Sequence, residues 1–258
     1  MRNLIRILTL NTWHNHRPWQ QRRNALVQGI VQYAPDILLF QELFDTNWSN
    51  ELQARFGFPY LVSTQSIQSG LVVLSRLAAH GSEVYRMKTK SPFETYSRYA
   101  LWTELGSADY RLSVFNTHLS WELQDDATRQ AQVAELWSFM EKHRSGFIVV
   151  AGDFNCTPDS LAMTWLISHS GFVDTYAILH PGEVGFTWSN KNFFAQNQRP
   201  LLPERRIDYV LADPGLVKNR LRRCEVVFDV PQSDGMFASD HFGVLAEFEP
   251  YEGADLSC

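Results

Sequence analysis

Several apolar runs in this chain stop at residues that can bind a metal ion or move a proton. Each run has the length and composition of a buried strand. The polar endings are Asn11, Gln41-Glu42, Asn116-Thr117-His118 and Gly152-Asp153-Phe154-Asn155, after runs at residues 8–10, 37–40, 114–115 and 148–151. One such ending is common in any protein. Four in one chain indicate strand ends that converge on a common cleft.

The remaining pattern predicts strands and helices in mixed order. Further strands are expected at residues 71–74, 100–105, 111–115, 207–211, 225–230 and 244–248. Helices are expected at 18–33 with Pro18 in the first turn, from Asp125 or Asp126 through Met140, and at 159–170 between Pro158 and Gly171. Consecutive strands between helices favour two sheets packed face to face with helices outside. Residues 181–203 are polar and irregular, and we expect a long functional loop inside one domain, 1–258.

Composition narrows the class of protein. Hydrophobic residues make up 45% and charged residues 20%, which excludes a disordered chain, a collagen and a coiled coil. The net charge of −5 argues against binding nucleic acid through bulk charge. No apolar run approaches the ~20 residues of a membrane helix, and the first residues do not form a secretion signal. Three cysteines without zinc spacing favour reduced thiols, so we expect a cytoplasmic protein. We expect no obligate protein partner.

Asp153 and Asn155 are the first candidates for catalysis. Two residues apart on extended backbone, they would point to the same face. A carboxylate there can take a proton from water while the amide orients an oxygen. Gly152 allows close approach of backbone or ligand. A simple turn after a strand would contain the same residue types.

Glu42 is the first candidate metal ligand. It follows an apolar run, so its carboxylate is partly desolvated and suits a hard cation such as Mg²⁺, with Asn11 as a neutral oxygen donor. Asp240 and His241 are adjacent and can serve separate roles, Asp240 on the metal and His241 on a phosphate. Asp208 would then fix the His241 imidazole. Each of these residues alone also fits an ordinary strand-end or loop position.

His118 is a second candidate imidazole in the cleft, and a strand-end histidine with structural partners is the alternative.

In chain order the motifs resemble the endonuclease/exonuclease/phosphatase superfamily, which has the DNase I-like fold. The matching pieces are Leu10-Asn11-Thr12-Trp13, Gln41-Glu42, Thr117-His118-Leu119, Gly152-Asp153-Phe154-Asn155, Arg206-Ile207-Asp208-Tyr209 and Ser239-Asp240-His241. This resemblance implies a four-layer α/β sandwich, in which helices flank two packed mixed sheets and the cleft lies at one edge.

The resemblance also implies roles for the candidate residues. Glu42 would be the main Mg²⁺ ligand (Mn²⁺ or another divalent cation being the alternative), assisted by Asn11 and Asp240. Asp153 would generate or orient the attacking water, Asn155 and His118 would contact the scissile phosphate, and Asp208 would pair with His241. Either Asp153 or the Asp208–His241 pair could be the base. Thr12, Trp13 and His14 follow Asn11 where some members carry an acid, which does not favour their second metal site.

The implied activity is Mg²⁺-dependent hydrolysis of a phosphate ester by water. The segments 185–190 and 205–211 are similar to those of neutral sphingomyelinases, which cleave a lipid phosphodiester. Trp188, Phe193 and Phe194 would then rim a lipid or choline pocket, because aromatic faces attract quaternary ammonium groups. Packing of these rings inside the domain is the structural alternative.

A nuclease or nucleotide phosphodiesterase is the alternative activity. Residues 152–160 resemble the deadenylase and nocturnin branch, which acts on RNA tails or nucleotides. Local basic groups could contact substrate phosphates or form a solvated face: Arg17, Arg22 and Arg23, then Arg199, Arg205 and Arg206, then Arg220, Arg222 and Arg223. A non-catalytic phosphate-binding module on the same fold is a third hypothesis. Its expected loss of a site residue is not seen in this sequence.

Overall fold

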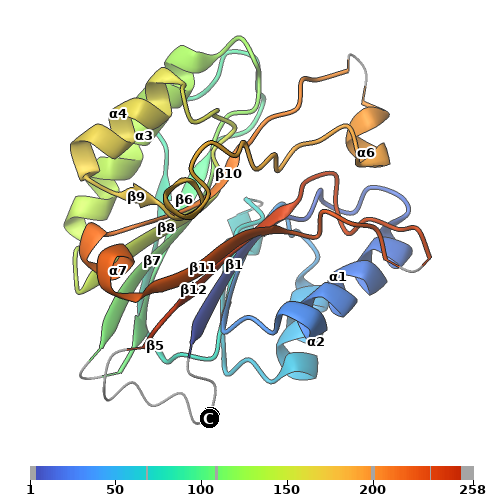
Figure 1. The fold of residues 1–258 in the computed structure, drawn as a ribbon, viewed down its shortest axis with the longest axis horizontal. Coiled ribbons are helices and arrows are strands. Elements are labelled where there is room, and N and C mark those ends of the chain that lie inside the picture. Colours follow the sequence, from blue (N-terminus) through green and yellow to red (C-terminus); the bar gives the residue numbers. More distant parts are fainter. Residues whose placement is uncertain (1–3, 68, 108–109, 199–200, 233, 251–258) are drawn as a thin grey trace.

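Two six-stranded sheets pack against each other, and helices cover both outer faces (Figure 1). The computed structural model describes residues 4–67, 69–107, 110–198, 201–232 and 234–250. The first sheet has the order β11 (Leu221–Val227), β12 (Gly243–Phe248), β1 (Ile5–Asn11), β2 (Ile37–Gln41), β4 (Val72–Ser75) and β3 (Tyr60–Ser63). The second has the order β5 (Ala79–Arg86), β6 (Tyr99–Gly106), β7 (Arg111–His118), β8 (Phe147–Asp153), β10 (Asp208–Ala212) and β9 (Val173–Asp174).

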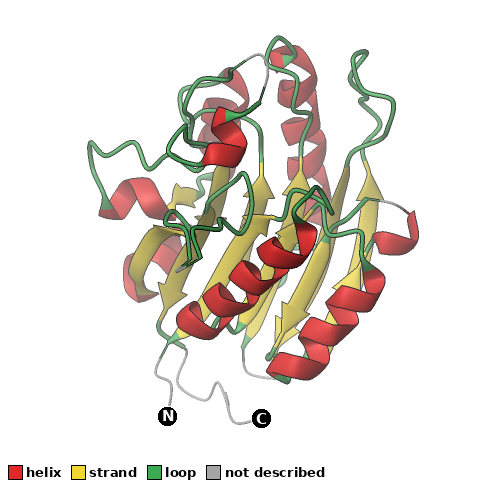
Figure 2. Cartoon of the chain, turned by 90° about the vertical axis from the view of Figure 1, so that its right-hand side faces the viewer, coloured by secondary structure: helices red, strands yellow, loops and turns green. Residues whose placement is uncertain are grey.

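Both sheets are mixed. β1 and β2 are parallel in the first sheet, β7 and β8 are parallel in the second, and the other pairs are antiparallel. The long helices lie outside the sheets, α1 (Trp19–Tyr33) and α2 (Thr46–Phe56) on the first, α3 (Asp126–Lys142) and α4 (Leu161–Ser170) on the second. Figure 2 looks onto the face that α1 and α2 cover. This arrangement confirms the predicted four-layer α/β sandwich.

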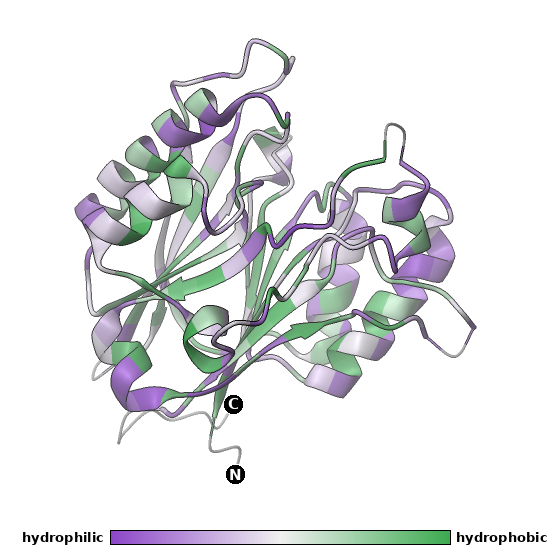
Figure 3. Ribbon diagram, turned by 45° about the horizontal axis from the view of Figure 1, so that its top comes forward, coloured by the Kyte–Doolittle hydropathy of each residue, from purple (hydrophilic) through white to green (hydrophobic). Residues whose placement is uncertain are grey.

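Apolar side chains alternate between the two faces of each strand. In β1, Ile5 and Ile7 enter the core between the sheets, whereas Leu8 and Leu10 pack under α1 and α2. Figure 3 shows the resulting apolar strands at the centre of the molecule. The alternation continues to the strand ends, so Asn11 also faces the space between the sheets and hydrogen-bonds across it.

A buried polar contact joins the two sheets near the ends of β2 and β7. The Gln41 side-chain amide on β2 donates to Asn116 Oδ1 on β7 at 2.7 Å, and both side chains are fully buried. Asn116 Nδ2 donates in turn to the carbonyls of Phe40 and Val72, at 2.9 and 3.1 Å. These directional bonds fix how the sheets meet, which apolar contacts alone do not.

Most predicted elements lie where expected, with shifted ends. Pro18 precedes α1 as its N-cap residue and is not in the first turn. The helix expected from 159 begins at Leu161, because the Ser160 side chain caps it through the Met163 N–H. The strand expected at 225–230 is β11, which starts at Leu221, directly after α7.

Several elements were not predicted. They are α2, β3, β5, β9, α5 (Thr175–Leu179), α6 (Phe193–Gln196), α7 (Pro214–Arg220) and a 3₁₀ turn at Gln65–Ile67. Of these, α2 had a readable signal, because Asp45 caps its N-terminus and Gly57 ends it in a left-handed conformation. The expected long loop at 181–203 contains α6 among its described residues.

In the part of the chain that the structure describes, none of the helices is long and apolar enough to span a bilayer. Cys156 and Cys224 are buried free thiols, and Cys258 lies outside the described residues.

The contact between the sheets gives a stability prediction. Asn116→Ala removes the partner of the Gln41 amide and of two buried carbonyls, so we expect a loss of about 2–4 kcal/mol in the free energy of unfolding. Asn219→Ala, on the exposed surface of α7, is the matched control and should change it by less than about 0.5 kcal/mol. Urea unfolding of both variants measures the difference. Equal stability of the two would contradict a role for Asn116 in joining the sheets.

Candidate active site

The strand register places three candidate residues in one row across the second sheet. His118 at the end of β7 pairs with Asp153 at the end of β8, and Asp153 pairs with Asp208 at the start of β10. In the first sheet, Asn11 at the end of β1 pairs with Gln41, directly before Glu42. The predicted convergence of strand ends is therefore confirmed for these residues.

Asn11 links the carboxylates of the two sheets. Its Nδ2 donates to Glu42 Oε1 and to Asp153 Oδ2, both at 3.0 Å. Its Oδ1 accepts from the Trp13 N–H at 2.9 Å, which fixes the orientation of the amide. Asn11 was expected to offer this oxygen to a metal. In the structure the amide nitrogen faces both carboxylates.

Two imidazoles flank Asp153. His118 Nε2 lies 3.4 Å from Asp153 Oδ2 and 4.0 Å from Glu42 Oε1. His241 Nε2 lies 3.7 Å from the same Asp153 oxygen, while its Nδ1 is 3.0 Å from Asp208 Oδ2. The predicted pairing of Asp208 with His241 is thus present in the structure.

The two imidazoles differ in protonation. Burial, with the positive charges of Arg98 and His241, holds the pKa of His118 well below its ordinary value, so this ring is neutral. Burial would also lower the pKa of His241, but Asp208, Asp153 and Asp240 outweigh it and raise that pKa to about 10. His241 is therefore a cation at neutral pH, and its Nδ1 donates to Asp208 Oδ2 at 3.0 Å.

Two buried carboxylates have raised pKa values. Burial and the nearby Asp208 raise the pKa of Asp153 to about 6, although His241 and the Asn11 amide oppose the shift. Burial raises the pKa of Asp240 to about 7, and the charge of Glu42 adds to this shift. The charges of His241 and Arg22 oppose the shift. Bringing a cation close would favour the ionised form of each group.

The oxygen atoms of Glu42 and the carboxylates around it fit a hard divalent cation. Glu42 keeps a partly exposed side chain at the open end of the site, and the charge of Glu42 reaches buried Asp240. Oxygen donors of this kind are those that Mg²⁺ prefers. Ligand atoms of Asp153, Asp208 and His241 also lie within 4.8 Å of one another. That cluster suits a metal less well, because a protonated His241 already bonded to Asp208 has no lone pair to offer.

The backbone after Asp153 differs from the prediction. β8 ends at Asp153, and Asn155 has a left-handed conformation with φ of 51°. Asp153 Oδ1 accepts from the Asn155 N–H, so the two residues form a turn and the expected extended backbone is wrong here. The Asn155 amide donates to the Leu119 carbonyl, beside His118. Gly152 does allow a close approach, since a Cβ there would lie 2.0 Å from the Thr117 carbonyl oxygen.

The sequence suggested that Trp188 and Arg206 bind substrate at the open site. In the structure both side chains are buried and do not reach it. Trp188 is only 6% exposed and packs edge-on against the His241 ring, with centroids 5.0 Å apart. Arg206 is also buried, forms an ion pair with Asp174 and lies over the Tyr209 ring. Phe193 and Phe194 pack on one another and on other aromatic side chains. These four side chains serve packing, which was the structural alternative for the aromatic residues.

Arg22 is a residue whose role the sequence analysis missed. It was assigned to a basic cluster, but its side chain is fully buried. Its guanidinium donates to five backbone carbonyls, those of Thr12, Trp13, His14, His16 and Ala238. It thereby ties the loop after Asn11 to the segment before Asp240. The signal was its helical spacing with Ala25, Leu26, Gly29 and Ile30, which are also buried.

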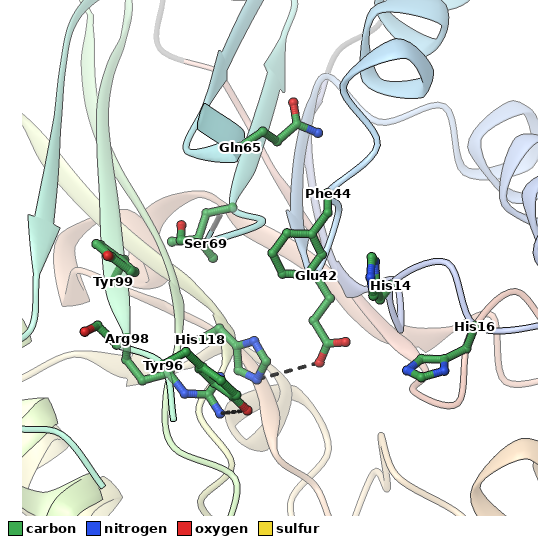
Figure 4. A pocket seen from close by; sticks show the side chains of 12 residues that line it. His14, His16, Glu42, Phe44, Gln65, Ser69, Tyr96, Arg98, Tyr99 and His118 are labelled. Carbon is green, nitrogen blue, oxygen red and sulfur yellow. Dashed lines mark hydrogen bonds and ion pairs between the residues drawn. The ribbon is translucent and has the colours of Figure 1, made fainter. Parts of the chain in front are cut away.

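A cavity of about 760 Å³ opens beside Glu42 and His118 (Figure 4). His14 and His16 reach it from the loop after β1, and Phe44 from the segment after β2. Tyr96, Arg98 and Tyr99 line it from the start of β6 and the residues before it. Figure 4 shows the Glu42 carboxylate between His118 on one side and His14 and His16 on the other.

Carboxylates, an amide and two imidazoles meet where the ends of the two sheets join. This arrangement defines a DNase I-like hydrolase of phosphate esters. The model of the Endonuclease/Exonuclease/phosphatase family matches residues 8–241, and the chain belongs to this family. The predicted family and enzyme class are thereby confirmed.

Known proteins similar to this chain differ in what their names describe. A Caenorhabditis elegans protein named as a neutral sphingomyelinase-like protein is 24% identical over 95% of this chain and 66% of its own length. This chain thus spans about two thirds of that relative. The structure of D. rerio TDP2 complexed with single-strand DNA product has a TM-score of 0.77 at 18% identity, covering 96% of this chain and 99% of that one. A Bacteroides thetaiotaomicron mannosyl-6-phosphatase has a TM-score of 0.75 at 15% identity, covering 95% and 99%.

Arg22 provides a prediction with a neighbour as its control. Arg22→Met leaves five carbonyls without their buried donor, so we expect a loss of about 3 kcal/mol or more in the free energy of unfolding. Arg23→Met removes only an ion pair with exposed Glu51 and a contact over Trp48, and should cost less than about 1 kcal/mol. Denaturant unfolding of the two variants measures the difference. If Arg22→Met were as stable as Arg23→Met, the loop would not depend on this guanidinium.

Proposed function

We propose that this protein is a Mg²⁺-dependent phosphodiesterase that hydrolyses its substrate by direct attack of water. The observation that carries the proposal is the meeting of Glu42 and Asn11 from one sheet with Asp153, His118 and the Asp208–His241 pair from the other. Membership of the family supports ester hydrolysis and the use of a divalent cation. The intact set of site residues argues against a non-catalytic binding module.

Each residue has a role that follows from its surroundings. Asp153 accepts the proton of the attacking water, because its raised pKa makes it a better base than an exposed aspartate. Asn11 holds the Asp153 and Glu42 carboxylates in place. His241 is protonated and donates to a phosphate oxygen, and Asp208 keeps it charged. His118 and Asn155 contact the scissile phosphate.

Glu42, with Asp240 behind it, would hold the Mg²⁺ ion. A bound divalent ion supplies charge neutralisation at a non-bridging phosphate oxygen. Asp240 is buried, and a hydrogen bond from Ser239 Oγ at 3.2 Å orients its carboxylate.

Similar proteins suggest two substrate classes for the same chemistry. The sphingomyelinase-like relative favours a lipid phosphodiester, and the structure of D. rerio TDP2 with single-strand DNA favours a nucleic acid or nucleotide. Of the aromatic residues that the sequence analysis assigned to a choline pocket, Trp188 and Phe194 are buried and Phe193 packs on Phe194, so they do not support the lipid substrate. The chemistry at phosphorus is common to both classes.

Removal of the metal and of Asp153 tests the reaction. Hydrolysis of bis(p-nitrophenyl) phosphate should disappear in EDTA and return with Mg²⁺. Asp153→Asn should lower kcat by about 10²–10⁴-fold, because the proposed base is lost. Asp159→Asn changes an exposed acid shortly after the same strand and should leave kcat unchanged. Full activity in EDTA, or in Asp153→Asn, would refute the mechanism.

The Asp208–His241 pair gives a pH prediction. His241 acts in its protonated form, so activity should fall as pH rises through the pKa of this imidazole. Asp208→Asn removes the neighbouring carboxylate charge that most strongly raises this pKa, and the alkaline limb of the pH–rate profile should move to lower pH by about 1 unit or more. The profile of kcat/KM in wild type and variant measures the shift. An unmoved alkaline limb would exclude His241 as the titrating acid.

A further inference from the structure

The cavity beside Glu42 and His118 has walls built from rings. On one wall, the His14 and Phe44 rings pack edge to face with centroids 4.7 Å apart. On the other, the Arg98 guanidinium lies 4.8 Å above the Tyr96 ring. Glu94 holds Arg98 through two hydrogen bonds of 2.8 and 2.9 Å, so this wall is also well ordered. A volume of about 760 Å³ is sufficient for one sugar or nucleoside group.

The lining is unsuitable for an acyl chain. Among the described residues that line the cavity, Phe44 and Leu71 are the two whose side chains carry no polar atom. An acyl chain would therefore lie mainly against side chains that carry hydroxyl, amide, imidazole and guanidinium groups.

The charges are also unsuitable for a choline group. The lining includes one carboxylate, Glu42, which the proposed reaction assigns to the metal ion. Arg98 also lines the cavity, and Glu94 is its ion-pair partner. A quaternary ammonium group would face these groups without a free counter-charge, although the aromatic rings by themselves would attract it.

We propose that this cavity binds the organic group of the substrate as a neutral ring with polar edges, the chemistry of a nucleoside or a hexose. The proposal rests on the proposed function and names its substrate class. The ring stacks between Phe44 and Tyr96, and its polar edge faces Gln65 and Ser69, which Figure 4 shows away from His118. The phosphate then lies at the Glu42 and His118 end, where the reaction takes place.

Four phosphomonoesters that differ only in their organic group test the proposal. Thymidine 5′-monophosphate, glucose 6-phosphate, phosphocholine and glycerol 3-phosphate are titrated calorimetrically into the full chain with Mg²⁺. They are also assayed as inhibitors of bis(p-nitrophenyl) phosphate hydrolysis. We expect at least one ring compound to bind about 10-fold or more tightly than phosphocholine and glycerol 3-phosphate, as a stacked ring would. The tighter of the two ring compounds identifies the source of the ring.

Variants in the cavity wall provide the control. Tyr96 is 50% exposed, so Tyr96→Ala removes half of the stacking site with little effect on folding. Tyr96→Ala and Phe44→Ala should abolish the preference for the ring compound and leave glycerol 3-phosphate binding unchanged. Phe93→Ala removes an exposed ring of the same loop that does not line the cavity, and should keep the preference.

Two results would overturn the assignment. One is phosphocholine binding as tightly as both ring compounds, and the other is a ring preference that survives in Tyr96→Ala and Phe44→Ala. Absence of ester hydrolysis in the wild type would instead refute the proposed function, and the calorimetric ranking would still report on the cavity.

Discussion

A buried hydrogen bond between the Gln41 and Asn116 side chains connects two sheets whose other core contacts are mainly apolar. Apolar burial drives the sheets together but has no direction, so it does not specify which strand ends lie opposite each other. A buried amide pair does, because any slip would leave its donors and acceptors without partners. Gln41 directly precedes Glu42, and Asn116 lies two residues before His118. The contact therefore lies close in sequence to Glu42 and His118, which approach to 4.0 Å across the sheets.

This site concentrates negative charge in a buried place. Glu42, Asp153, Asp208 and Asp240 provide four carboxylates, and His241, Arg22 and Arg205 are cations whose charges act on them. Full ionisation of these seven groups leaves an excess of one negative charge in a buried place. Burial and this negative charge together raise the pKa values of Asp153 and Asp240. A cation close to these carboxylates would favour their ionised forms.

The sequence predicted this site well where the alternation of side chains along a strand determines which way each side chain points. Asn11, His118, Asp153 and Asp208 continue the inward alternation of their strands, so their convergence follows from the apolar pattern before them. Periodicity ends with the strand, and the prediction for Asn155 failed there because an Asx-type turn replaces extended backbone. Arg22 and Arg206 were misassigned because composition treats a basic side chain as a surface charge. Their partners, five carbonyls and Asp174, lie elsewhere in the chain and become evident only in three dimensions.

The division between strands and loops explains how one fold can serve several substrates. Residues assigned to the reaction lie at strand ends or immediately beside them, where the pairing of neighbouring strands fixes their positions. The cavity is different, since His14, Phe44 and Tyr96 all lie in connecting segments. A substitution there changes the shape and polarity that the organic group meets without moving the row of His118, Asp153 and Asp208. A fold of this kind can therefore keep the residues at its strand ends while its loops change the organic group that is bound.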